Sequence, residues 1–206
     1  PENLDAAKAA PLLCAGITTY SPLRHFGVKE GHKVGVIGMG GLGHMGVKFA
    51  KAMGAEVTIF TRSESKVSEA KKQGADHVII STDEKQMEEA KETFDFLLDT
   101  VPVQHDLNPY INCLKVDGTH ILVGLLEPVD PALQAGQLVL KRRVLAGSLI
   151  GGIPETQEML DFCAEHDIHC DVEMLDIKNI NDAFKRMKKG DVKYRFVIDM
   201  DTLKQS

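Results

Sequence analysis

The fold is decided by the stretch Val36-Ile37-Gly38-Met39-Gly40-Gly41-Leu42-Gly43-His44, a glycine-rich turn set between a short strand and an amphipathic helix. The residues before it, 33–37, form a β-branched apolar run that predicts a strand, and Gly38 ends that run where a tight turn needs an unhindered backbone. After the turn, apolar and small residues recur at the spacing of one buried helix face: Leu42, Met45, Gly46, Phe49, Ala50 and Met53.

The glycines of this turn have separate expected roles. Gly40 lets the backbone approach a pyrophosphate, while Gly43 and Gly46 permit close packing of the helix on the strand. The start of the helix offers free N–H groups and a partial positive charge, which suit a phosphate. With its strand and its helix both in place, the turn predicts a dinucleotide-binding site rather than an ordinary glycine-rich loop.

Composition narrows the class of protein. The chain has 206 residues, of which 43% are hydrophobic and 26% charged, which is ordinary for a globular protein and enough for one α/β domain with a remainder. A formal net charge of −6 gives no basic excess for a nucleic acid or an anionic membrane. No apolar run approaches the roughly 20 residues of a membrane span. We therefore expect neither kind of partner.

Two further features concern origin and location. The chain starts Pro1-Glu2-Asn3 without an initiator methionine or an apolar signal region, which suggests a piece of a longer protein. Its four cysteines lack C-x-x-C spacing, which favours a reducing compartment, the cytoplasm, over a disulfide framework.

Short β-branched runs alternate with helical patterns from Lys33 onward, which predicts βαβ units and a parallel sheet covered on both faces. We expect six strands, as in two mononucleotide-binding halves, at 33–37, 56–61, 77–80, 94–99, 120–123 and 144–150. Helices are expected near 65–73, 83–92 and 106–114, and an earlier helix ends near Phe26-Gly27. The predicted fold class is thus α/β, a six-stranded doubly wound parallel sheet of the Rossmann type.

The rhythm changes after Gly151-Gly152. The tail predicts a helix at 154–165, a strand at 172–175, a helix at 180–189 and a strand at 194–198. We expect residues 1–152 to form the nucleotide-binding domain with its leading helix, and residues 153–206 to belong to another domain.

The end of the second strand predicts which dinucleotide binds. An acid at this point would accept hydrogen bonds from the free ribose hydroxyls of NAD, and that acid is missing. In its place stand Thr61, Arg62, Ser63 and Lys66, whose hydroxyls and cations suit the 2′-phosphate of NADP. The alternative is that these are solvated residues at a helix start, with Ser63 as its N-cap, and the nearby Glu64 weakens the NADP interpretation slightly.

Two stretches together closely resemble the zinc-dependent medium-chain alcohol dehydrogenases, in particular their cinnamyl alcohol dehydrogenase branch. They are residues 12–23, read as Leu12-Leu13-Cys14-Ala15-Gly16-Ile17-Thr18-Thr19-Tyr20-Ser21-Pro22-Leu23, and the glycine turn continued to Gly46. Residues 147–152 and the ending Tyr194-Arg195-Phe196-Val197-Ile198-Asp199 resemble the same branch, so that the resemblance covers almost the whole chain. It implies that the tail is a remnant of the family's GroES-like catalytic domain.

The resemblance also implies roles for individual residues. Cys14 would be one ligand of the catalytic zinc, and Thr18, one helical turn later, would contact the nicotinamide. The pyrophosphate would be held by the turn, with Arg195 returning from the tail to neutralise it. The remaining implied cofactor-binding residues are Gly38, Gly40, Gly41, Leu42, Gly43, Thr61, Arg62, Ser63, Lys66, Thr100, Val101, Val123, Gly124, Ser148 and Ile150.

One departure from the family is an absence. A catalytic zinc takes three protein ligands, and this chain carries only Cys14 of the family's set. Cys113, Cys163 and Cys170 match no family ligand, and we expect them to be packing residues. For His44, which follows the turn, an approach to the phosphates and a structural role stay equally open.

The sequence therefore predicts the NADP(H)-binding part of a zinc-dependent alcohol dehydrogenase that interconverts primary alcohols and aldehydes. The rivals are a zinc-free NADPH quinone reductase on the same fold and a non-catalytic NADPH-binding scaffold. The apolar sixth strand would leave an unpaired sheet edge, and with the resemblance this predicts a homodimer. By itself the chain is expected to bind NADP(H) without holding stoichiometric zinc or reducing an aldehyde.

Overall fold

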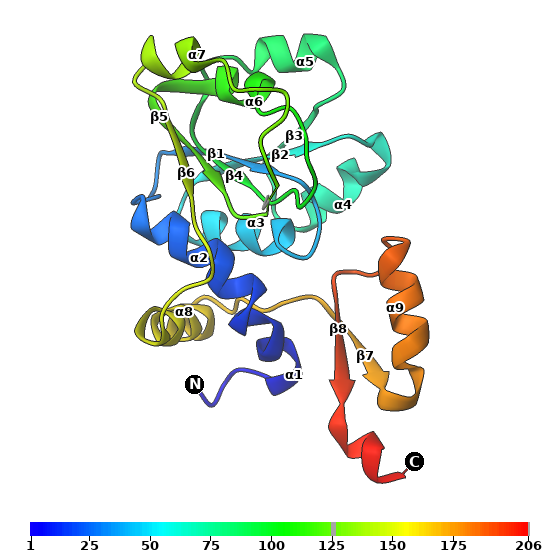
Figure 1. Ribbon diagram of the computed structural model, residues 1–206. Coiled ribbons are helices and arrows are strands. Elements are labelled where there is room, and N and C mark those ends of the chain that lie inside the picture. The colour runs from blue at the N-terminus through cyan, green and yellow to red at the C-terminus, as the bar shows by residue number, and fades with distance from the viewer. Residues whose placement is uncertain (125–126, 206) are drawn as a thin grey trace.

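The computed structural model describes residues 1–124 and 127–205, and its body is one six-stranded parallel sheet (Figure 1). The strand order is β3-β2-β1-β4-β5-β6. The chain thus starts in the middle of the sheet, winds outward to β3, and returns to build the other half from β4, which is the doubly wound order of two mononucleotide-binding units. The strands are β1 (Lys33–Ile37), β2 (Glu56–Thr61), β3 (His77–Ile80), β4 (Phe94–Asp99), β5 (Leu114–Leu122) and β6 (Val144–Gly147).

The predicted fold class is confirmed, and the first four strands have the expected bounds. The last two strands differ in three boundaries, the smallest being the end of β5, at Leu122 rather than Val123. β5 starts at Leu114 rather than His120, because its early residues pair with β4 through a register shift between Phe94 and Phe96. β6 ends at Gly147 rather than Ile150, and Ile150 itself adopts a φ of 47°, a left-handed conformation outside the β region.

Helices cover both faces of the sheet. On one face α2 (Ala15–His25), α3 (Gly43–Ala52) and α4 (Val67–Lys72) bury Phe49 and Ala70 against Val36 and Ile59. On the other face α5 (Glu84–Glu89) and α6 (Asn108–Cys113) enclose a second core around Phe60. The short elements are α1 (Ala6–Ala9), η1 (Ala10–Leu13), η2 (Glu64–Lys66) and α7 (Ala135–Val139). Within the described ranges, no helix has the length and apolar character needed to cross a membrane.

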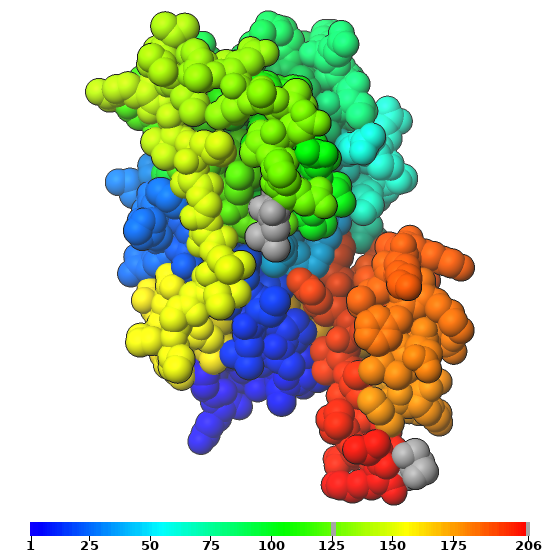
Figure 2. Space-filling view, in the orientation of Figure 1, coloured from blue at the N-terminus to red at the C-terminus, as the bar shows by residue number. Residues whose placement is uncertain are grey.

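The tail divides into two parts. Helix α8 (Ile153–Glu165) packs against α2, and its Met159 and Cys163 belong to the same core as the sheet. After it, β7 (Val172–Asp176), η3 (Ile177–Asn179), α9 (Ile180–Lys188), β8 (Arg195–Asp199) and η4 (Met200–Gln205) form a lobe around a separate two-stranded parallel sheet. Figure 2 shows this orange and red lobe projecting from one side of the body. The domain boundary after residue 152 stays a prediction.

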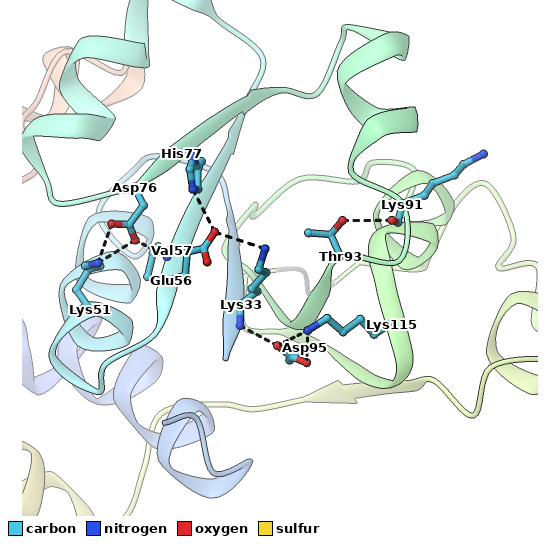
Figure 3. Close-up of polar contacts among 10 residues, drawn as sticks. All are labelled: Lys33, Lys51, Glu56, Val57, Asp76, His77, Lys91, Thr93, Asp95 and Lys115. Carbon is cyan, nitrogen blue, oxygen red and sulfur yellow. Dashed lines mark hydrogen bonds and ion pairs between the residues drawn. The ribbon is translucent and has the colours of Figure 1, made fainter. Parts of the chain in front are cut away.

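Charged side chains bind together the amino ends of the strands, the edge opposite the glycine turn (Figure 3). Asp95 of β4 accepts from the Lys115 ammonium of β5 at 2.8 Å and from the Lys33 amide of β1 at 2.8 Å. Asp76 similarly accepts from Lys51 of α3 and from the amide of Val57. These bonds join four strands and one helix, so this edge serves stability.

The four cysteines are free thiols. Burial raises the pKa of Cys113 and of Cys163 to about 12 and that of Cys170 to about 11, so these thiols stay protonated. They fill the core as small apolar groups. Cys14 alone is exposed.

Candidate functional site

The sheet reverses its winding between β1 and β4, and the glycine turn lies at that point. β1 pairs with β2 on one side and with β4 on the other, so Gly38 after β1 and Thr100 after β4 lie next to each other. The amide and the hydroxyl of Thr100 both donate to the Ile37 carbonyl, at 3.0 and 2.8 Å. Ligands of open α/β sheets bind in the crevice at such a switch point.

Packing explains why the turn needs glycine. Gly38 has a φ of +93°, which L side chains rarely adopt. A Cβ on Gly43 would lie 2.1 Å from the Gly38 carbonyl oxygen, and one on Gly46 would lie 2.8 Å from Leu98 Cδ2 of the sheet. The first turn of α3 can therefore lie directly on the strands only because these side chains are missing.

The middle of the turn is open to a ligand. A Cβ on Gly40 would meet nothing within 4 Å. None of the described backbone carbonyls accepts a bond from the N–H groups of Gly40, Gly41 or Leu42, which stand just ahead of α3. Unpaired N–H groups at a helix start form a binding site for an anion.

Arg195 of β8 reaches this same turn. The Cβ position of Gly41 lies 2.7 Å from Cζ and Nε of the Arg195 guanidinium. Arg195 Nε is buried and has no hydrogen-bond partner among the described residues. An unpaired buried donor beside free N–H groups is costly unless an anion binds there, so these residues fit a pyrophosphate.

A cavity of about 280 Å³ opens beside the turn. It is lined by Gly38 and Met39 of the turn and by the residues that end β2, and Lys66 donates to the Met39 carbonyl at 3.4 Å. Thr61, Arg62, Ser63 and Lys66, the residues expected at a 2′-phosphate, all line this cavity. Two cations therefore stand at one end of the anion-binding turn.

The alternative interpretation of Ser63 is partly realised. Ser63 occupies the N-cap position of η2, yet its side chain makes no capping bond and its hydroxyl pairs with that of Ser65 at 2.7 Å. Glu64 is exposed and does not line the cavity. Among the described residues, Arg62 forms no ion pair that would neutralise it.

The far wall of the cavity holds residues that sequence reasoning missed: Ser81, Gln104, His105 and Tyr110. His105 presents Nδ1 to the Val103 carbonyl at 2.8 Å and Nε2 to the Asp99 carboxylate at 2.9 Å. Because both nitrogens face acceptors, the imidazolium form fits best, and the bond to Asp99 raises the pKa of His105.

Asp99 is fully buried and also contacts His120 Nε2 at 3.0 Å. Burial opposes its ionisation, but the bonds from His105 and His120 outweigh this and lower the pKa of Asp99. In the sequence, the position that could have pointed to these contacts is Asp99, a charged residue that ends a mostly apolar strand.

The other expected cofactor residues divide into two groups. Val101 and Gly124 lie close to Gly38 and Thr100; a Cβ on Gly124 would lie 2.6 Å from the Thr100 carbonyl carbon, and one on Gly38 would lie 3.2 Å from Val101 Cγ2. The amide of Val123 donates to the Asp99 carbonyl at 3.0 Å. Ser148 lies directly after β6, with its amide donating to the Leu122 carbonyl at 3.0 Å. Ile150 was expected at a strand end, and that placement is wrong, since it is half exposed three residues beyond β6.

Cys14 and Thr18 lie one helical turn apart, because the Thr18 amide donates to the Cys14 carbonyl at 3.1 Å. Cys14 lines a second cavity of about 420 Å³ together with Arg195 of the tail. Across residues 1–124 and 127–205, no group of three or more His, Cys, Asp or Glu side chains could hold a metal ion. Cys14 by itself does not make a zinc site.

His44 turns inward. It is fully buried and stacks on Tyr194 of the tail with ring centroids 4.5 Å apart. Its Nδ1 lies 3.2 Å from the Gly40 carbonyl, and burial lowers its pKa to about 4, so the ring is neutral. This geometry favours the structural role left open for His44.

Comparisons with known proteins agree with this geometry. The family model described as zinc-binding dehydrogenase matches residues 41–165. The aldehyde reductase YahK of Escherichia coli (strain K12) is 56% identical over 197 residues, which cover 96% of this chain and 56% of that protein. The vomilenine reductase of Rauvolfia serpentina is 52% identical over 210 residues, covering 100% of this chain and 58% of the relative. The chain thus spans a little over half the length of these relatives.

Solved structures give the same result. A cinnamyl alcohol dehydrogenase from Sorghum bicolor superposes with a TM-score of 0.92 at 42% identity, over 97% of this chain and 57% of that one. A cinnamyl alcohol dehydrogenase from Helicobacter pylori, complexed with NADP(H), gives 0.86 at 45% identity over 97% and 57%. On fold, turn and sequence together, the chain belongs to the zinc-binding dehydrogenase family.

Proposed function

We propose that this chain is the NADP(H)-binding part of an alcohol dehydrogenase that interconverts primary alcohols and aldehydes. One observation carries the proposal: a single glycine turn is flanked by the Arg195 guanidinium on one side and by a cavity holding Arg62 and Lys66 on the other. Cations on two sides of the turn suit a nucleotide with two separate anionic groups. The relatives support this proposal, since several of them are named NADP-dependent alcohol dehydrogenases.

In this proposal each group of residues has one task. The N–H groups of Gly40, Gly41 and Leu42 bind the pyrophosphate with Arg195, and Thr61, Arg62, Ser63 and Lys66 bind the 2′-phosphate. Thr100, Val101, Val123, Gly124 and Ser148 line the path toward the nicotinamide, which Thr18 contacts. When bound, NADPH supplies the hydride, and the protein's contribution is to orient the ring and exclude water.

Zinc belongs to the proposal at the level of the whole protein. The described residues offer Cys14 as one thiolate ligand and no complete site. Two further ligands would have to come from residues other than those described here. The chain by itself should therefore retain no stoichiometric zinc after dialysis and should show no aldehyde reduction.

The test is a titration of the 206-residue chain with NADPH and with NADH, beside elemental analysis and an assay of NADPH oxidation with cinnamaldehyde. We expect NADPH to bind well above NADH, with zinc far below one equivalent. Equal affinities for the two nucleotides would contradict the assignment of the 2′-phosphate pocket. One equivalent of zinc with steady turnover would mean that an unrecognised site exists in this chain.

Two rivals make different predictions for the full-length protein. A zinc-free quinone reductase would turn over without metal, so elemental analysis of the active protein distinguishes it. A non-catalytic scaffold would bind NADPH without reducing benzaldehyde or cinnamaldehyde. Cys14 at the head of α2, beside the cavity that also holds Arg195, favours the zinc-dependent dehydrogenase over both.

A homodimer in the cytoplasm completes the proposal. Within residues 1–124 and 127–205, β6 is the last strand of the sheet and pairs only with β5, and Leu149, Ile150 and Ile153 just beyond it are exposed. Such an apolar edge favours strand pairing with a second copy about a two-fold axis. Sedimentation equilibrium at tens of micromolar should give the mass of two chains; a single-chain mass over that range would refute the pairing. The four free cysteines support a reducing compartment.

A further inference from the structure

The Nε of Arg195 is buried and has no hydrogen-bond partner in the part of the chain that the structure describes, so no bond from this nitrogen holds the guanidinium in place there. Arg195 stands at the first position of β8. The residue that fixes this point is its neighbour Tyr194, which is 7% exposed.

Tyr194 is held on two sides by the body of the protein. Its ring stacks on His44 with an interplanar angle of 16°, and its hydroxyl donates to the Glu69 carboxylate of α4. Burial and the bond to Glu69 raise the pKa of Tyr194, so the hydroxyl remains a donor at all physiological pH values. We call Glu69, Tyr194 and His44 the tyrosine clamp.

The clamp connects directly to the anion-binding turn. His44 is the second residue of α3 and bonds through Nδ1 to the carbonyl of Gly40, whose neighbour Gly41 lies under the Arg195 guanidinium. The neutral His44 ring adds no positive charge that would compete with Arg195. One side of the clamp therefore orders the turn, and the other orders the arginine above it.

A second attachment keeps the tail in place independently of the clamp. The Tyr194 amide donates to the Asp171 carbonyl at 3.0 Å, and the Asp171 carboxylate accepts from Lys48 at 2.7 Å and from Gln73 at 2.6 Å. Loss of the Tyr194 hydroxyl would thus loosen the position of Arg195 without detaching the lobe.

We propose that Tyr194 is a positioning residue for the nucleotide pyrophosphate: clamped between His44 and Glu69, it sets Arg195 over Gly41 and so couples docking of the tail to cofactor binding. The inference rests on the proposed NADP(H) function. It predicts that the clamp affects recognition of the pyrophosphate and leaves recognition of the 2′-phosphate unchanged.

The experiment compares two probes by calorimetry: NADPH, and adenosine 2′-monophosphate, which has the 2′-phosphate and lacks the pyrophosphate. Tyr194→Phe keeps the stacking and removes the bond to Glu69. This variant should weaken NADPH binding about 3- to 10-fold, which is less than the roughly 10- to 100-fold loss of affinity expected for Arg195→Ala. Binding of adenosine 2′-monophosphate should stay unchanged in both variants.

A double-mutant cycle separates positioning from general stability. In the Arg195→Ala background, Tyr194→Phe should cause no further loss of NADPH affinity, because the group that it positions is gone. Glu69→Gln, which keeps an acceptor oxygen, should restore most of the affinity lost in Glu69→Ala. The matched control is Lys193→Ala, which removes the ion pair to Glu69 at 3.2 Å and leaves the Tyr194 bond intact; it should bind NADPH normally.

Three results would overturn the inference: an unchanged NADPH affinity in Tyr194→Phe, an equal loss for both probes, or a loss that persists without Arg195. Thermal denaturation of each variant identifies one that fails to fold, and Glu69→Ala then tests the clamp from its other end. An unmodified chain that binds neither probe would instead refute the proposed function.

Discussion

Reversing one charge in the cavity should change the cofactor preference of this chain. Arg62 lines the cavity beside Lys66, is exposed, and has no ion-pair partner among the described residues. If the proposed 2′-phosphate site is right, Arg62→Asp removes one charge-assisted hydrogen bond to that phosphate and places a carboxylate beside it. NADPH should therefore lose affinity, and NADH, which lacks that phosphate, should keep or gain it.

The size of the effect follows from the position of Arg62. A hydrogen bond between charged groups contributes about 1.5 to 3 kcal/mol, and because Arg62 is exposed we take the lower end, about 10-fold in affinity. A carboxylate about 4 Å from the phosphate adds about 1 kcal/mol of repulsion in water, a further factor of about 5. The two factors together lower NADPH affinity about 50-fold. The affinity that remains is attributed in part to Lys66, which still lines the cavity.

The fluorescence of bound NADPH gives a direct assay of binding, since the chain has no tryptophan whose fluorescence would interfere with the signal. The matched control is Lys72→Asp on α4, which changes the charge by the same amount away from the cavity and should alter NADPH binding by less than about 2-fold once salt screens it. Equal losses in the two variants, or equal losses for NADPH and NADH in Arg62→Asp, would refute the 2′-phosphate assignment.

Three other variants test the turn and the charged networks. Gly43→Ala should lower the free energy of unfolding by about 1 to 3 kcal/mol, because its Cβ would lie 2.1 Å from the Gly38 oxygen. Gly40→Ala, by contrast, should keep its melting temperature and lose NADPH affinity. Equal melting temperatures in the two variants would contradict the packing argument. Burial opposes ionisation of Asp95, but bonds from Lys115 and from the Lys33 amide lower its pKa, so its contribution is present at neutral pH and fades as pH falls below the ordinary 3.8. Asp95→Asn should therefore cost about 1 to 2 kcal/mol in urea unfolding at pH 7 and progressively less as the pH is lowered below 3.8, and a difference that stays constant over that range would count against it. The bond to Asp99 raises the pKa of His105, so the stabilisation that this residue contributes is complete below the ordinary 6.5 and is lost as pH rises through the raised value. The difference in melting temperature between the unmodified chain and His105→Gln should therefore shrink from pH 6 to pH 9. A difference that grows over this range would contradict the direction of the pKa shift.

Local patterns in the sequence determined most of the fold. The alternation of β-branched runs and helical faces depends on neighbours within one element, and it gave the six strands and their parallel class. The glycine turn and the cations at 61–66 lie within one βαβ unit, so spacing alone brought them to the same edge of the sheet. The two largest boundary errors came from features outside such patterns: a register shift between Phe94 and Phe96, and the left-handed backbone of Ile150.

The tertiary structure decided everything that joins distant parts of the chain. Arg195 was suggested by family resemblance, but only the fold lays its guanidinium on Gly41, and only the fold clamps Tyr194 between His44 and Glu69. The fold likewise brings His105 to the cavity that the glycine turn and the end of β2 line, where its ring bonds to Asp99. Periodicity records which face of an element is buried, not which distant residue covers it; that choice is made when packed elements dock and buried polar groups find partners.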